Sequence, residues 1–169
     1  MPPFSEAPTE GELRDWLERL RWPNGLVCPH CRWQATAAMP KRDVHRCRAT
    51  GCRRSFTVTV GTVLERTHHS LTVWWEAVSY LTNMDKGLSV RQLQRLLDLP
   101  YRSTWSIMER LRKIAPKQKG PFTLAPLTNE EVFIRLMSRP PVLPEERFAR
   151  LERQAQRLDA LAARAARRT

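Results

Sequence analysis

The chain has 169 residues, of which 41% are hydrophobic, and this length suits one ordinary domain or two small modules. Lys and Arg total 29 against 17 Asp and Glu, so the formal net charge of +12 favours polyanionic partners; an inert basic surface is the alternative. A transmembrane helix and a secretion signal are both excluded by the hydropathy pattern, so we expect a cytoplasmic protein with reduced thiols.

The first predicted element is a short amphipathic helix from Thr9 to Leu20. Thr9 and Glu12 have the spacing of a capping box, and a Pro-Asn-Gly turn at residues 23–25 ends the helix. The residues expected on its apolar face are Leu13, Trp16, Leu17 and Leu20.

Residues 26–63 have the pattern of short extended pieces separated by turns. We predict strands at Val44 to Arg46 and at Ser55 to Val58, and the alternation of β-branched residues continues to Val63. No part of this stretch contains enough apolar residues for a core of its own, so another stabilising element is needed.

Four cysteines occupy this stretch in two pairs. Two residues separate Cys28 from Cys31, four separate Cys47 from Cys52, and fifteen lie between the pairs. Structural zinc takes four ligands in a tetrahedron, and two tight turns that each present two thiolates supply them. The spacing therefore predicts a zinc ribbon in which all four cysteines bind one Zn²⁺. Four thiolates close the coordination shell, so we expect no catalysis at the metal.

Other chemistry for these residues is less favoured. Thiol redox activity or iron binding is the alternative to zinc, but the sequence lacks a thioredoxin-like pattern. His30 and His45 are interpreted as solvated groups or neighbours of the ligands, with direct ligation as the alternative. Arginines surround the second cysteine pair, and we expect them to contact phosphates rather than only to keep the sheet soluble. They are Arg46, Arg48, Arg53 and Arg54.

Helical periodicity returns in three predicted helices, at residues 71–84, 89–97 and 101–115. Ser89 and Gln92 form a second capping-box pattern at the start of the middle helix. The apolar positions of the first helix are Leu71, Trp74, Trp75, Val78 and Leu81.

The second and third of these helices have the lengths and the short connecting turn, at residues 98–100, that are typical of a helix-turn-helix. A three-helix core whose charged face is merely solvated is the alternative. Trp74, Trp75 and Trp105 are assigned to the core rather than to base stacking because of their spacing. The predicted inner face contains Val90, Leu93, Leu97, Leu99, Trp105, Met108 and Leu111. The predicted outer face of the third helix contains Arg102, Ser103, Ser106, Glu109, Arg110 and Lys113.

The last third of the chain predicts a basic connector, a brief helix starting at Thr128, and a basic helix from about Glu145 to Arg167. Val132, Phe133, Leu136 and Met137 of the brief helix are interpreted as cover for an apolar gap, with an anchor for another protein as the alternative. The basic helix has a short heptad seam. It supports either a homodimer or folding back onto the same chain, and membrane binding is disfavoured.

Several stretches occur in the order found in one protein family: LRWPNGLVCPHC, CRATGCRRSFTVTVGTVLERTHHSL, WWEAVSYL and KGLSVRQLQRLLDLPYRSTWSIMERLRKI. Over residues 20–114 the chain resembles the N-terminal part of bacterial insertion-sequence transposases that open with a zinc ribbon. The resemblance implies that the four cysteines bind zinc and that the helical unit contacts DNA at transposon ends. Arg32 departs from the family pattern, because a glycine usually follows the first cysteine pair.

These transposases continue into an RNase-H-like catalytic domain. Only 55 residues follow Ile114, too few for that fold, so we expect no catalytic residues and no enzymatic activity. Two-metal chemistry requires carboxylates that converge from separate segments. The acidic residues interpreted instead as capping or solvated charges are Glu130, Glu131, Glu145, Glu146, Glu152 and Asp159.

Together these patterns predict a small α+β protein: a zinc ribbon, then a three-helix helix-turn-helix unit, then a helical extension. The expected segments are an N-terminal helix (1–22), the ribbon (23–66), the helix-turn-helix unit (67–116), a linker with a short helix (117–143) and a basic C-terminal helix (144–169).

The leading functional hypothesis is a zinc-dependent regulator of transcription, derived from a transposase, that binds double-stranded DNA in the nucleoid. One alternative is an accessory transposition protein that acts with a catalytic subunit in trans, and another is an adaptor for RNA polymerase or a different protein. The residues expected to contact DNA are Arg48, Arg53, Arg54, Arg91, Arg102, Ser103, Ser106, Arg110 and Lys113.

Overall fold

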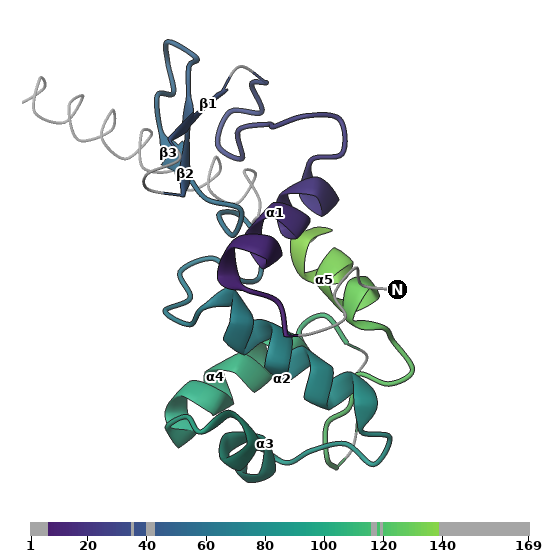
Figure 1. Ribbon diagram of the computed structural model, residues 1–169. Helices are drawn as coiled ribbons and strands as arrows, with labels where there is room; N and C mark the ends of the chain where they lie inside the picture. Colours follow the sequence, from purple (N-terminus) through teal and green to yellow (C-terminus); the bar gives the residue numbers. More distant parts are fainter. Residues whose placement is uncertain (1–6, 35, 40–42, 116–117, 119, 139–169) are drawn as a thin grey trace, which may run out of the picture. The chain divides into compact units, whose positions relative to one another are not determined.

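The described part of the chain contains five helices and three strands in a small α+β arrangement, as predicted (Figure 1). The computed structural model describes residues 7–34, 36–39, 43–115, 118 and 120–138, and the predicted helix at residues 144–169 lies outside them. None of the described helices has the length and apolar character needed to cross a bilayer. The elements are α1 (Glu10–Arg21), β1 (Thr36–Met39), β2 (Val44–Cys47), β3 (Ser55–Phe56), α2 (Leu71–Asn83), α3 (Val90–Leu97), α4 (Tyr101–Arg112) and α5 (Asn129–Ser138).

Helix α1 begins at the predicted capping box. The Glu12 backbone N–H donates to the Thr9 hydroxyl at 3.3 Å, and the Thr9 backbone N–H donates to the Glu12 carboxylate at 2.8 Å. The Thr9 N–H and the Thr9 hydroxyl both donate to the Glu12 carboxylate, and these two bonds lower the pKa of Glu12. On the buried face of the helix, Trp16 meets Trp75 and Phe133 edge to face, with ring centroids 5.7 and 5.4 Å away.

The strands form one antiparallel sheet in the order β1-β2-β3, in which His45 lies opposite Phe56 and Arg46 opposite Ser55. Strands β2 and β3 were predicted, but β3 ends at Phe56, so its expected extension to Val58 is wrong. Strand β1 was not predicted. Its residues, Thr-Ala-Ala-Met, lack the β-branched alternation that identifies a strand in sequence.

Residues 57–66, here called the junction loop, form successive turns instead of continuing the strand. Gly61 has a φ of 77°, a value that interrupts an extended chain. The Thr62 hydroxyl donates to the Thr59 carbonyl at 2.6 Å and stabilises the next turn. Val58, Val63 and Leu64 are buried all the same. The β-branched residues Val58 and Val63 therefore reflect burial against the helices rather than a strand.

Two arginines from different helices hold the junction loop. Arg21, at the end of α1, donates to the carbonyl oxygens of Val58 and Val60. Arg110, on α4, donates to the carbonyl oxygens of Val63 and Glu65 at 2.7 and 2.8 Å. Burial lowers the pKa of Arg21 to about 10, which still leaves the guanidinium charged at neutral pH. The loop is thereby joined to the first helix and to the helical unit by charged hydrogen bonds.

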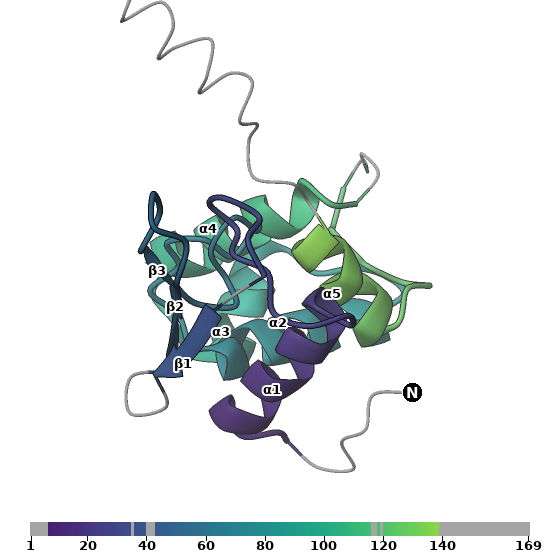
Figure 2. The same cartoon turned by 90° about the horizontal axis from the view of Figure 1, so that it is seen from above.

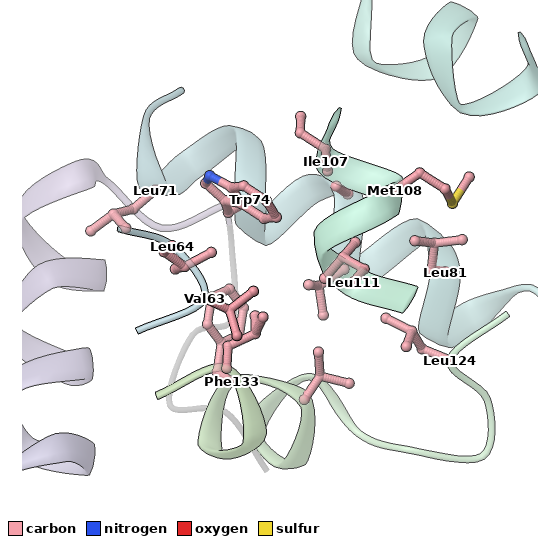
Figure 3. Close-up of a cluster of buried hydrophobic side chains, with 14 of the residues drawn as sticks. Val63, Leu64, Leu71, Trp74, Leu81, Ile107, Met108, Leu111, Leu124 and Phe133 are labelled. Carbon is pink, nitrogen blue, oxygen red and sulfur yellow. The ribbon is translucent and has the colours of Figure 1, made fainter. Parts of the chain in front are cut away.

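The main apolar core forms around α2. Figure 1 shows α2 between α1 and α5 on one side and α3 and α4 on the other, and Figure 2 again places α1 beside α5. In the close-up, Val63 and Leu64 of the junction loop converge with Trp74 of α2, Leu111 of α4 and Phe133 of α5 (Figure 3). Segments far apart in sequence therefore share one core.

Helices α3 and α4 are joined by a short turn, and α3 begins at the predicted capping box of Ser89 and Gln92. Asp98 adopts the left-handed conformation at the end of α3, with φ 48° and ψ 46°. The assignment of Trp105 to the core is wrong, because its side chain is 46% exposed. The buried residues of α4 are Thr104, Ile107, Met108 and Leu111.

The segment predicted as a linker contributes to the core. Leu88 and Phe122 exchange backbone hydrogen bonds of 2.8 and 3.0 Å, and Gly87 makes this approach possible, because a Cβ there would lie 2.9 Å from the backbone of Phe122. The apolar residues of α5 cover the core, which confirms the first of the two interpretations for this helix. They are Val132, Phe133, Leu136 and Met137.

Candidate metal centre and basic surfaces

The four cysteine sulfurs form one cluster, as the spacing predicts. All four Sγ atoms lie within 4.8 Å of one another, with 3.9 Å between Cys28 and Cys52 and 3.5 Å between Cys31 and Cys47. A tetrahedral zinc ion with Zn–S bonds of about 2.3 Å places its sulfurs roughly 3.8 Å apart. The donor set and its spacing therefore fit one Zn²⁺ bound by four thiolates, and this site is a zinc ribbon.

The two cysteine turns repeat the same backbone design. In the first, the Cys28 N–H donates to the Trp33 carbonyl at 2.9 Å; in the second, the Cys47 N–H donates to the Arg54 carbonyl at 2.9 Å. Each bond closes a loop that ends two residues after the second cysteine of its pair. The second turn also places a backbone amide beside a ligand sulfur, since the Ala49 N–H donates to Cys47 Sγ at 3.4 Å. Such amides stabilise the thiolate form that zinc requires.

Arg32 and Arg53 occupy equivalent positions in the two turns, directly after the second cysteine. Their φ angles are 62° and 46°, in the left-handed region that favours glycine. Arg32, which departs from the family pattern noted in the sequence, therefore adopts a conformation that favours glycine. The Arg32 N–H still donates to the Cys28 carbonyl at 2.8 Å, and the conformational cost falls on the arginine backbone.

Burial and hydrogen bonding act differently on the individual thiols. Burial raises the pKa of Cys28 and raises that of Cys47 to about 12, whereas a bond from the Trp33 backbone lowers the pKa of Cys31. Cys28 and Cys47 are fully buried, and they pack with Phe56 in a small second core. Because the buried thiols hold their protons in the metal-free chain, zinc binding displaces those protons.

The histidines near the site are not members of the sulfur cluster. Nε2 of His45 lies 2.7 Å from the Glu18 carboxylate of α1, and its ring packs against Trp22 and Phe56 at centroid distances of 6.2 and 5.7 Å. Its Nδ1 is buried and has no hydrogen-bond partner among the described residues. His45 therefore joins the ribbon to α1, a role that its sequence context did not indicate.

Three arginines gather beside the metal site. Arg46, Arg48 and Arg53, together with Cys47, line an open concavity of about 440 Å³. All three side chains are exposed, as is that of Arg54, and none forms an ion pair with a described residue. The structure thus brings together three of the four arginines that the sequence assigned to the second cysteine pair.

The residues of the helical unit that were predicted to contact DNA divide into three groups. Arg91, Arg102 and Lys113 are exposed, whereas Ser103 and Ser106 are half-buried. Arg110 donates to the junction loop, so its guanidinium is engaged within the protein. Sequence reasoning missed this role because the helical period places Arg110 on the flank of α4, where the neighbouring loop decides its contacts.

Of the six acidic residues considered for metal chemistry, Glu131 has a structural role. Its carboxylate accepts bonds from the Thr128 N–H at 2.8 Å and from the Thr128 hydroxyl at 3.0 Å, and these bonds lower its pKa. This is the capping predicted for it. Four of the others lie beyond residue 138, outside the described residues: Glu145, Glu146, Glu152 and Asp159.

Comparisons with known proteins agree with this geometry. Residues 8–55 match the family described as a transposase zinc-ribbon domain, a range that includes α1 and all four cysteines. No solved structure matches the chain.

The chain is also similar to an uncharacterized protein in transposable element ISH50 of Halobacterium salinarum. The two are 26% identical over 136 residues, which cover 80% of this chain and 45% of the relative, so the chain spans about half the length of the curated relative it matches. By sequence, residues 8–55 therefore match a transposase zinc-ribbon domain, and the longer stretch is similar to a protein of a transposable element. The sulfur cluster in this structure has the spacing that such a zinc site requires.

Proposed function

We propose that the chain binds duplex DNA through the zinc ribbon and the α3–α4 pair, and that its targets are the ends of a transposable element. The observation that carries the proposal is the group of exposed arginines beside Cys47. Arginine binds phosphate oxygens in bidentate fashion, and each neutralised phosphate releases counterions from the duplex. Arg46, Arg48 and Arg53 would contact the backbone, since no described carboxylate neutralises them.

The helical unit supplies a second basic surface. Arg91 and Arg95 of α3 and Arg102 of α4 are exposed, and Lys113 follows at the end of α4. In a helix-turn-helix, the second helix lies in the major groove while the first crosses the backbone. The short turn at Asp98 and the capped start of α3 suit this use.

The zinc ion has a structural role in this proposal. It would hold the two cysteine turns so that the arginines stay on one surface, and a closed shell of four thiolates leaves no position for a reacting water. We assign any strand transfer to a separate domain or subunit. The relative's name favours a role in transposition over our first hypothesis, the control of transcription. A homodimer through residues 144–169 and a contact with RNA polymerase are not part of the proposal.

The test is a binding titration of the zinc-loaded full chain with two fluorescent duplexes. One carries the terminal inverted repeats of the transposable element that holds the relative, and the other is a shuffled duplex of equal length. If about five to eight phosphates are neutralised, the log–log dependence of affinity on salt has a slope of about −4 to −7. We expect this slope, with tighter binding to the repeats.

Single variants assign the phosphate contacts. Arg48→Ala and Arg53→Ala should each make the slope shallower by about 0.9. Arg19→Ala, which removes an exposed arginine of α1, is the matched control and should leave the slope unchanged. A flat salt response rules out duplex binding through phosphates, whereas equal affinity for both duplexes rules out only the transposon-end assignment.

A further inference from the structure

Helix α4 exposes two aromatic side chains on the same flank. Tyr101 is 50% exposed and Trp105 is 46% exposed. They lie four residues apart, so their side chains are neighbours on the helix surface. The buried face of α4 is complete without them, because Thr104, Ile107, Met108 and Leu111 all point into the core. The aromatic pair therefore has no role in the core that explains it.

An exposed arginine adjoins this aromatic pair on α4, and another lies on the preceding helix. Arg102 is exposed and lies three residues before Trp105 on α4, and Arg95 is exposed near the end of α3. The acidic residue on this side, Glu109, lies 3.8 Å from Arg112 and is thereby partly neutralised. An aromatic surface beside an arginine that forms no ion pair with a described residue is complementary to a polyanion that also offers apolar groups.

Duplex DNA offers such groups in the major groove, where thymine carries a 5-methyl group beside its hydrogen-bonding edge. The N-terminal residues of the second helix of a helix-turn-helix contact base edges. Tyr101 and Arg102 are the first two residues of α4, and Trp105 begins its second turn. Phosphates, in contrast, give an indole ring no favourable apolar contact.

We propose that Tyr101 and Trp105 determine the sequence preference of this protein through apolar contact with thymine methyl groups, while Arg102 binds the adjacent base edge or phosphate. This inference rests on the proposed function, since it names the base that the α3–α4 surface reads. It also moves sequence reading away from Arg110, whose guanidinium already donates to Val63 and Glu65.

The test begins with enrichment of bound sequences from a random duplex library by the wild-type chain. We expect an enriched site with at least one fixed thymine. Replacing that thymine by uracil removes only the methyl group and should weaken wild-type binding about fourfold, the value of one buried methyl. Trp105→Ala should lose the preference at that position and become insensitive to the uracil substitution. Trp105→Phe retains an apolar ring and should restore part of both effects.

The matched control is Ile134→Ala, which removes a side chain of similar exposure, 43%, from α5. This variant should enrich the same DNA sequence as the wild-type chain and should show the same loss of affinity when uracil replaces the thymine. Circular dichroism confirms that each variant remains folded. The proposal is overturned if Trp105→Ala and Tyr101→Ala both enrich the wild-type DNA sequence and both lose the wild-type amount of affinity when uracil replaces the thymine. It is equally overturned if they change only self-association, which would assign the pair to a protein interface.

Failure of the proposed function has a different signature. In that case the wild-type chain enriches no duplex at all and shows a flat salt response in the earlier titration. If the wild-type chain binds duplex DNA with a steep salt response but enriches sites without a thymine dependence, the proposed function stands and this inference is wrong.

Discussion

His45 illustrates how a potential metal ligand can instead support the surroundings of a metal site. Its Nε2 atom lies 2.7 Å from the Glu18 carboxylate, and the ring packs against Phe56, which is itself buried with Cys28 and Cys47. The ring thus contacts α1 through Glu18 and the small core through Phe56. The four sulfurs, which lie within 4.8 Å of one another, remain the complete ligand set.

The assignment of four thiolates as the zinc ligands predicts different effects for the loss of a cysteine and for the loss of a nearby histidine. Cys47→Ser removes a buried ligand and should abolish binding of one zinc per chain at micromolar zinc, because three thiolates hold the ion less tightly. His30→Ala should retain one zinc, since the backbone amide at that position is unchanged. Metal content after gel filtration measures both. Zinc retained by the first variant and lost from the second would contradict the tetrathiolate assignment.

At the scale of elements, the junction loop is the feature that joins the ribbon to the helices. Arg21 and Arg110 donate to four of its carbonyl oxygens from α1 and α4. Carbonyl groups in a turn-rich loop lack the partners that a strand would give them, and buried ones without partners are costly. The two guanidinium groups supply those partners and fix the loop to both helices.

The role of Arg110 can be separated from DNA contact. Arg110→Met keeps most of the apolar stem but loses the charged hydrogen bonds to Val63 and Glu65, so unfolding free energy should fall by about 1.5–3 kcal/mol. Arg102→Met, at an exposed position of the same helix, should change it by less than about 0.5 kcal/mol. Urea denaturation measures both values. A stable Arg110→Met variant with a shallower salt slope would instead indicate a phosphate contact.

The whole described molecule contains two apolar cores of unequal size. The larger one joins α1, α2, α3, α4, α5 and the junction loop. The smaller one has only Cys28, Cys47 and Phe56 fully buried, with Trp22 and Leu26 among the side chains packed against it. So few buried side chains cannot stabilise the sheet alone, and zinc binding supplies the missing free energy.

Removal of zinc should therefore unfold one part of the molecule only. After chelation, backbone amides of β2 and β3 should exchange with solvent rapidly, whereas those of α2 and α4 should stay protected, because their core contains no metal ligand. Hydrogen exchange with mass spectrometry measures this peptide by peptide, and zinc added back in excess should restore protection. Loss of protection throughout the chain would mean that the two cores unfold as one unit.

Features set by short spacings were predictable from the sequence. The capping boxes of Thr9 with Glu12 and of Ser89 with Gln92 form within one helical turn, and the cysteine pairs form within single turns. Each depends on neighbours in the chain, so local sequence determines it.

Only the tertiary structure could decide which neighbours cover the flanks of α4. Trp105 and Arg110 lie at similar angles on either side of the buried stripe of this helix, and the helical period alone assigns neither to the core nor to solvent. The junction loop approaches one flank and takes the Arg110 guanidinium, while the indole of Trp105 on the other flank remains exposed. The hydrophobic residue therefore became the surface group and the charged residue the structural one, because contacts between distant segments override the preference of a single side chain.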